Sequence, residues 1–141
     1  MKELIAADSN ICRNCKLLTS IKGVGPITAV VMLCSTLNFT KITDHRKFAC
    51  YCGLAPFEHS SGTSVRGGCH TSSMANRDIK VQLNRSALIA IRCDPQLKAY
   101  YERKVAEGKH KFSVLNAVRA KIAARCFAVV RRGTPYVALQ I

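Results

Sequence analysis

The segment LLTSIKGVGPITAVVML, residues 17–33, decides how this chain is expected to fold. Apolar residues at helical spacing lead into the tripeptide Gly-Val-Gly, residues 23–25, where glycine permits backbone conformations that other residues avoid. Pro26 follows, and proline is favoured as the first residue of a helix. The segment therefore predicts two helices joined by a tight turn, with the second helix continuing through Leu37.

This arrangement, over residues 17–37, resembles a helix–hairpin–helix, a module that grips the DNA backbone without reading its sequence. Gly23 and Gly25 would let the main chain approach a phosphate, and the free N–H groups and positive dipole end of the second helix favour an anion. Lys22 adds a positive charge. We interpret these three residues as nucleic-acid contacts; the alternative is a turn that only joins two helices.

Helical patterns also cover most of the remaining chain. Further helices are expected over residues 2–20, from Thr43 or Asp44 to Cys52, from Asn76 through Ile91, over residues 96–107, and from a Ser113 cap to Gly133. Any strand is confined to residues 55–70. The predicted fold class is mainly α, a compact helical domain with a hairpin element and a Gly/Ser-rich loop.

The charge of the chain points to nucleic acid as the partner. The 141 residues carry a net charge of +14, and residues 76–141 hold fourteen Lys/Arg against only four acidic residues. No lipidation signal or amphipathic anchor suggests a membrane partner. The basic residues proposed to contact DNA or RNA in this half are Arg77, Lys80, Arg119 and Arg125.

The eight cysteines are interpreted as free thiols. The N-terminus lacks the long apolar region of a signal peptide, so a reducing, cytoplasmic location is expected. Cys12 and Cys15 form a C-x-x-C pair, but no second pair exists to complete a zinc site. No metal site is predicted in this chain.

The segment GLAPFEHSSGTSVRGG, residues 53–68, is expected to form a shaped, exposed loop, which we call the serine loop. Ser60 and Ser61 offer hydroxyl groups, Arg66 offers a planar cation, and the glycines expose backbone N–H donors. This composition suits phosphate chemistry. A polar surface turn is the alternative.

The order of these segments carries a family resemblance. Residues 17–33, the run FACYCGLAP at residues 48–56, Ser60-Ser61-Gly62 and the later Met74-Ala75-Asn76 resemble the C-terminal domain of DEDD-type insertion-sequence transposases of the IS110 family, the bridge-RNA-guided recombinases. The resemblance covers residues 15–137. It implies that residues 17–137 form this C-terminal domain and that residues 1–16 are a remnant of an interdomain helix.

The resemblance also implies a mechanism. In that family a RuvC-like domain supplies four metal-binding acids, and a serine of the C-terminal domain becomes covalently joined to a DNA phosphate during strand exchange. Ser61, which precedes Gly62, maps onto that serine, and Ser60 is the neighbouring candidate. The implied partners are DNA, a guide RNA and, in the full-length form, further copies of the protein. Mg²⁺ is expected at the RuvC-like domain and no cofactor in this chain.

Two departures qualify the resemblance. Ser73 and Ala75 stand where the family often has lysine and glycine, and Ile79-Lys80 replaces Leu-Arg. No residues before the hairpin could hold a nuclease domain, so the chain is expected to be an excised domain or the product of a truncated element, inactive alone. The alternative function is a non-catalytic nucleic-acid-binding module. A stand-alone hydrolase is disfavoured because no Gly-x-Ser-x-Gly elbow is present.

Overall fold

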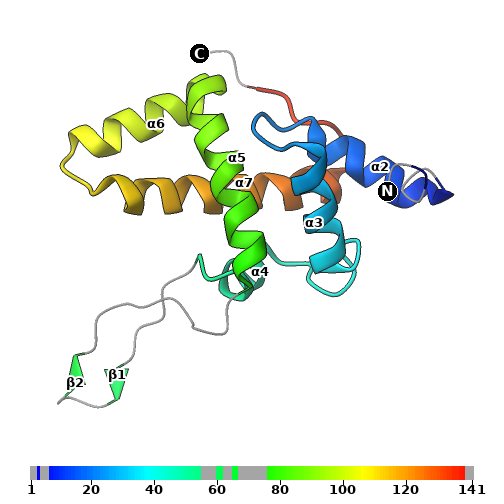
Figure 1. Cartoon of the computed structure of the whole chain (residues 1–141), viewed down its shortest axis with the longest axis horizontal. Helices are drawn as coiled ribbons and strands as arrows, with labels where there is room; N and C mark the ends of the chain where they lie inside the picture. The colour runs from blue at the N-terminus through cyan, green and yellow to red at the C-terminus, as the bar shows by residue number, and fades with distance from the viewer. Residues whose placement is uncertain (1–2, 4–6, 55–59, 62–64, 67–75, 139–141) are drawn as a thin grey trace.

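The computed structural model describes residues 3, 7–54, 60–61, 65–66 and 76–138. Their predicted fold class, mainly α, is confirmed, and Figure 1 shows the helices gathered around the long α7. The elements are α2 (Ser9–Thr19), α3 (Pro26–Thr36), α4 (His45–Tyr51), β1 (Ser60–Ser61), β2 (Val65–Arg66), α5 (Arg77–Cys93), α6 (Pro95–Ala106) and α7 (Lys111–Arg132).

Capping side chains fix where most of the helices begin. The Asp44 carboxylate, rather than Thr43, accepts a hydrogen bond from the Arg46 amide at 3.0 Å at the start of α4. Asn76 caps α5 in the same way, and Asp94 caps α6 directly before Pro95. These caps act over two or three residues, which is why the predicted starts of α4 and α5 agree with the structure and the predicted start of α6, residue 96, is one residue late.

The predicted Ser113 cap of the last helix is wrong. Helix α7 begins at Lys111, and the His110 imidazole accepts the capping hydrogen bond from the Phe112 amide at 3.3 Å. Gly108, with φ of +87°, ends the preceding helix and turns the chain so sharply that α7 starts three residues later. Ser113 is thereby drawn into the first turn of the helix. Gly133, with φ of +69°, ends α7 as predicted.

Helix α7 is the centre of the hydrophobic core. It packs against α2, α4, α5 and α6, and α5 crosses it in Figure 1. Val118, Ile122 and Cys126 on its inner side are completely buried. Burial of each large apolar side chain contributes about 1.5–3 kcal/mol to the free energy of unfolding.

The turn between α2 and α3 packs against α5. A Cβ atom on Gly23 would lie 2.5 Å from the carbonyl oxygen of Ser86, and the φ of Gly23 is +94°. The Thr28 hydroxyl contacts the Ser86 hydroxyl at 3.2 Å in a buried position. The two predicted helices and their turn are therefore present, and one glycine of the turn is required by packing inside the protein.

Only two short parts of the serine loop belong to the described residues. Strands β1 and β2 pair antiparallel, within the range 55–70 where a strand was expected. Predicted features at residues 55–59, 62–64 and 67–75 lie outside the described residues. None of the described helices has the length and apolar character needed to cross a membrane.

Candidate nucleic-acid interface

The described residues on either side of the serine loop, Leu54 and Asn76, are held to helices. At its entry, the Leu54 carbonyl accepts a hydrogen bond of 2.9 Å from the side-chain amide of Asn116 on α7. After its exit, the Asn76 amide donates to the Tyr51 carbonyl on α4 at 3.1 Å. These bonds fix where the chain leaves the helical body at Leu54 and where it re-enters the body at Asn76, beside α4, α5 and α7.

The strand register relates the two candidate serines to the arginine of the loop. Ser60 stands opposite Arg66 in the antiparallel pair, and Ser61 stands opposite Val65. The main chain therefore brings the predicted cation Arg66 level with Ser60 and one residue away from Ser61. Both serines lie within the same two-residue strand, so the pairing alone does not choose between them.

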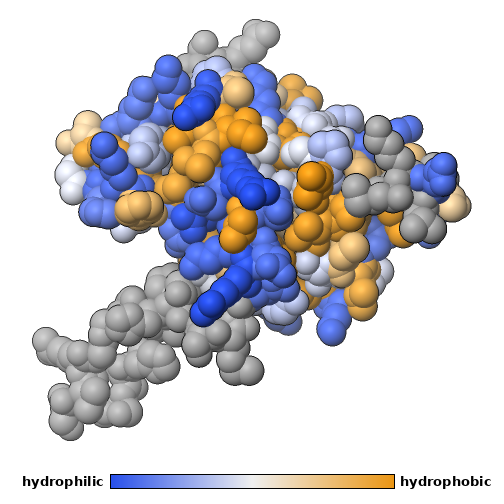
Figure 2. Space-filling view, viewed as in Figure 1, coloured by the Kyte–Doolittle hydropathy of each residue, from blue (hydrophilic) through white to orange (hydrophobic). Residues whose placement is uncertain are grey.

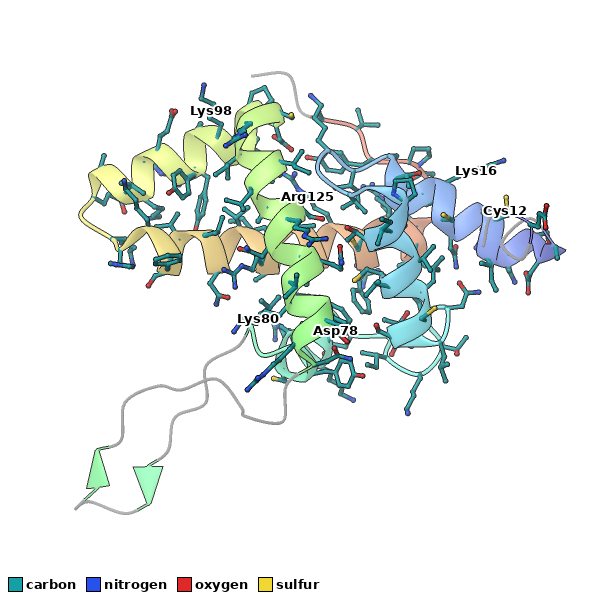
Figure 3. The ribbon with its side chains drawn as sticks, viewed as in Figure 1. Cys12, Lys16, Asp78, Lys80, Lys98 and Arg125 are labelled. Atoms are coloured by element: carbon teal, nitrogen blue, oxygen red, sulfur yellow. The ribbon has the colours of Figure 1, made fainter. Side chains whose placement is uncertain are left out.

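Three of the predicted nucleic-acid contacts converge between α5 and α7. They line a depression of about 400 Å³, which we call the basic hollow. Figure 3 shows Lys80 at the N-terminal end of α5, close to the point where the chain returns from the loop. The residues that line the basic hollow are Arg77, Lys80, Val81, Asn84 and Arg119.

Arg119 is the innermost cation of the basic hollow. Its Nη1 donates to Asn116 Oδ1 at 3.4 Å, and Asn116 is the same residue that anchors Leu54. Its buried Nε finds no hydrogen-bond partner among the described residues, nor does the buried Oδ1 of Asn84. Burial lowers the pKa of the Arg119 guanidinium from its usual value. A half-buried cation with a free donor is poised to bind an anion, because an unmade buried hydrogen bond is costly.

Arg125 has a different environment from the other predicted contacts. Its Nη1 donates to Asp94 Oδ2 and its Nη2 to Gln96 Oε1, both at 2.7 Å. Its guanidinium also lies 4.7 Å from the ring centroid of Tyr136. These internal contacts engage Arg125 in holding α7 to α6, and its contact with nucleic acid stays a prediction that its surroundings do not favour.

The hairpin turn packs against a different part of α5, near Ser86 and Ala90. Lys22 is exposed, whereas Gly23 faces Ser86 and Ala90 of that helix. Gly25 precedes α3, no side chain caps this helix, and a Cβ on Gly25 would meet no atom within 4 Å. Of the two glycines, Gly25 is thus the one with open space beside it.

Sequence analysis missed a second basic depression, the groove between α6 and α7. This groove has a volume of about 810 Å³, and Tyr100 and Arg103 contribute to it from α6. Their i, i+3 spacing, which places them on the same side of a helix, was the available signal. The pairing of α6 with α7 was needed to bring them opposite Lys121 and Arg132.

The described cysteines, histidines and acidic residues do not assemble into any group of three that could hold a metal ion. Within the C-x-x-C pair, burial and then the charge of Cys12 raise the pKa of Cys15, which disfavours the thiolate that metal binding requires. The arrangement of Arg77, Lys80 and Arg119 is a candidate site for an anion, because Arg and Lys side chains are the usual protein partners of phosphate groups.

Comparison with known proteins identifies the family of the chain. Residues 15–102 match the family described as "Transposase IS116/IS110/IS902 family". The chain belongs to this transposase family. The matched range contains the hairpin, the serine loop and two cations of the basic hollow, Arg77 and Lys80, and it ends before α7.

Relatives of this IS116/IS110/IS902-family chain are insertion-element and DNA-inverting proteins. The IS110 43.6 kDa protein of Streptomyces coelicolor is 39% identical over 120 residues, which cover 84% of this chain and 29% of the relative. The pilin gene-inverting protein of Moraxella bovis is 24% identical over 95% of this chain and 42% of its own length. The IS900 42 kDa protein of Mycobacterium paratuberculosis is 30% identical over 78% of this chain and 28% of its own length. The chain thus spans less than half the length of these relatives.

Proposed function

We propose that this family member is the part of a transposase that binds DNA and forms the covalent serine–DNA link, with Ser61 as the nucleophile. The observation that carries the proposal is the basic hollow, whose Arg119 bonds to Asn116, the residue that holds Leu54 at the entry of the serine loop. A loop that holds a nucleophile needs cations close by to bind the DNA phosphates. Arg77 and Lys80 lie in the first turn of α5, the first helix after the serine loop in the chain, and Arg119 of α7 lines the same hollow.

The proposed step is a phosphoryl transfer. The Ser61 Oγ attacks a DNA phosphorus, a new Ser Oγ–P bond forms, and the P–O bond to the departing deoxyribose oxygen breaks. The serine proton is balanced by the proton that the departing oxygen gains. The phosphoserine link conserves the phosphodiester, so a hydroxyl of a second strand can attack it, restore the free serine and complete the exchange.

The basic hollow supports this reaction electrostatically. Negative charge spreads over the phosphate oxygens in the transition state, and fixed cations stabilise that charge. Arg119 is suited to this role because its half-buried guanidinium has already lost part of its hydration. We place the expected Mg²⁺ in a RuvC-like domain outside this chain, where it would activate the attacking or departing oxygen.

Because the chain covers less than half the length of its relatives, we propose a more limited role for the chain by itself. For the chain by itself we propose nucleic-acid binding through the basic hollow, and we assign strand exchange to the longer family protein. DNA is the first partner in this proposal, and a guide RNA is the second. Lys/Arg contacts to phosphates release counterions, so affinity should fall steeply as the salt concentration rises.

The proposal is tested in a full-length family protein that contains this chain as its C-terminal part, so that the substituted residues are those numbered here. Ser61→Ala and its matched control Ser60→Ala are compared in a plasmid transposition assay and by trapping of labelled DNA on the denatured protein. Ser61→Ala is expected to abolish both transposition and the covalent adduct, while DNA affinity stays within about twofold. Loss of the adduct in Ser60→Ala alone would move the nucleophile to Ser60. Retention of the adduct in both variants would refute the covalent mechanism.

A further inference from the structure

The groove between α6 and α7 is a second place where positive charge gathers. The two helices are joined through residues 107–110 and diverge from there, as Figure 1 shows, and the C-terminal segment returns toward α6. The Tyr136 hydroxyl of this segment contacts Gln96 Oε1 at 3.5 Å. The result is a concave space of about 810 Å³ with walls from both helices and the C-terminal segment.

Of the four cations that line this groove, Arg125 is paired with the buried Asp94, whereas the other three have no acidic partner in the lining. Arg103, Lys121 and Arg132 have exposed side chains, and no described residue of the lining is an aspartate or glutamate. Arg103 reaches Glu107 only at 3.9 Å in an exposed pair, which stabilises little. Several cations around one concave space repel one another, and a bound polyanion removes that repulsion.

Two tyrosine rings contact three of the cations that line the groove. Lys121 Nζ lies 4.5 Å from the centroid of the Tyr100 ring, and Arg103 Cζ lies 5.8 Å from the same centroid. Arg125 covers the Tyr136 ring on the other side of the groove. Cations alternating with aromatic rings are typical of sites for unpaired nucleic acid, where phosphates contact the cations and bases stack on rings or guanidinium planes.

We propose that the groove between α6 and α7 binds an unpaired nucleic-acid strand. A concave space between two helices admits the splayed phosphates and bases of a single strand better than the convex surface of a duplex. An acidic peptide would use the cations but not the rings. The groove shares no lining residue with the basic hollow, so one chain could hold a duplex at the hollow and an unpaired strand here. The inference does not depend on the serine chemistry.

The experiment measures binding of labelled oligothymidylate, oligouridylate and a DNA duplex to the chain over a salt series. The groove variant combines Lys121→Gln with Arg132→Gln. The matched control combines Arg92→Gln with Lys98→Gln, which removes the same charge outside the lining; Lys98 lies on the outer side of α6 (Figure 3). The groove variant is expected to lose about tenfold or more in single-strand affinity, and its slope of log K against log salt to fall by about 1.4, at roughly 0.7 per contact. The control should change single-strand affinity less than twofold.

A second readout locates the strand. Oligonucleotides that carry iodouracil should crosslink to Tyr100 or Tyr136 when irradiated. The oligothymidylate and oligouridylate arms distinguish DNA from RNA, and preference for either supports the proposal. The proposal is overturned if the groove and control variants lose equal affinity, or if the groove variant loses equal affinity for duplex and single strand. It is also overturned if crosslinks form only elsewhere, or if polyglutamate competes as strongly as an oligonucleotide. Ser61 is not part of the groove lining, so failure of groove binding is distinct from failure of the serine mechanism.

Discussion

Arg125 and Asp94 form an almost completely buried ion pair. Arg125 Nη1 lies 2.7 Å from Asp94 Oδ2, and the exposed fractions of the two side chains are 15% and 1%. The same carboxylate caps α6 through its other oxygen, which accepts hydrogen bonds from the amides of Gln96 and Leu97. One buried carboxylate therefore fixes both the start of α6 and its attachment to α7.

Removing only the cation of this pair should destabilise the protein strongly. Arg125→Met leaves the Asp94 carboxylate buried without its partner, which is expected to lower the free energy of unfolding by about 3–5 kcal/mol. The double variant Asp94→Asn/Arg125→Met should recover a large part of that loss, because asparagine still caps the helix and carries no charge. Urea denaturation followed by circular dichroism measures both. A loss below about 1 kcal/mol in Arg125→Met would contradict the structural role.

The two glycines of the α2–α3 turn should respond differently to alanine. Gly23→Ala places a Cβ 2.5 Å from the Ser86 carbonyl at a φ of +94°, and we expect it to cost about 2 kcal/mol or more. Gly25→Ala has open space and an ordinary φ of −88°, so its stability should change little. Thermal unfolding compares the pair. If the hairpin also contacts DNA, Gly25→Ala weakens duplex binding without lowering the melting temperature. Equal melting temperatures for Gly23→Ala and Gly25→Ala would refute the packing role of Gly23.

Arg119 should show a trade-off between stability and binding. Its half-buried guanidinium carries an Nε without a partner among the described residues, and desolvation lowers its pKa. Arg119→Leu should therefore keep or raise the melting temperature while weakening duplex binding about five- to tenfold. Arg92→Gln, an exposed cation outside the basic hollow, is the matched control and should change neither. Unchanged duplex affinity in Arg119→Leu would remove Arg119 from the proposed interface.

The buried thiols should make the protein less stable at high pH. Burial raises the pKa of both Cys52 and Cys126 from 9.0 to about 12. Above pH 9 the unfolded chain releases these protons while the native protein keeps them, so the free energy of unfolding falls between pH 9 and 12 by about 1.4 kcal/mol per thiol and pH unit.

The pH dependence is measured by urea denaturation between pH 8 and 10.5. Cys126→Ala is the control, since it should reduce the slope of the free energy against pH by the contribution of one thiol. Native Cys34 and Cys93, which are exposed, should react with maleimide at neutral pH, whereas Cys52 and Cys126 should not. Rapid labelling of native Cys126 would contradict its burial.

Sequence by itself determined the features that depend on neighbouring residues. Caps such as Asp44, Asn76 and Asp94 bond to amides two or three positions away, and Gly108 and Gly133 end helices through their own backbone angles. The helical class, the turn before Pro26 and the family resemblance all follow from such local patterns and their order. Ser113 shows where local patterns fail. Serine is a good capping residue, but the preceding turn fixes the start of α7 at Lys111, so His110 is the cap instead.

Tertiary structure decided which of the basic residues share a site. Periodicity placed Arg119 and Arg125 on one helix, but only the packing of α7 against α5 and α6 gave Arg119 a free donor in the basic hollow and Arg125 a buried partner. The left-handed run Leu37–Asn38–Phe39 is likewise held by distant contacts, such as Phe39 on Phe127 at 4.9 Å. Side-chain spacing along a chain is local information, whereas the burial and pairing of a charge depend on residues far away in the sequence.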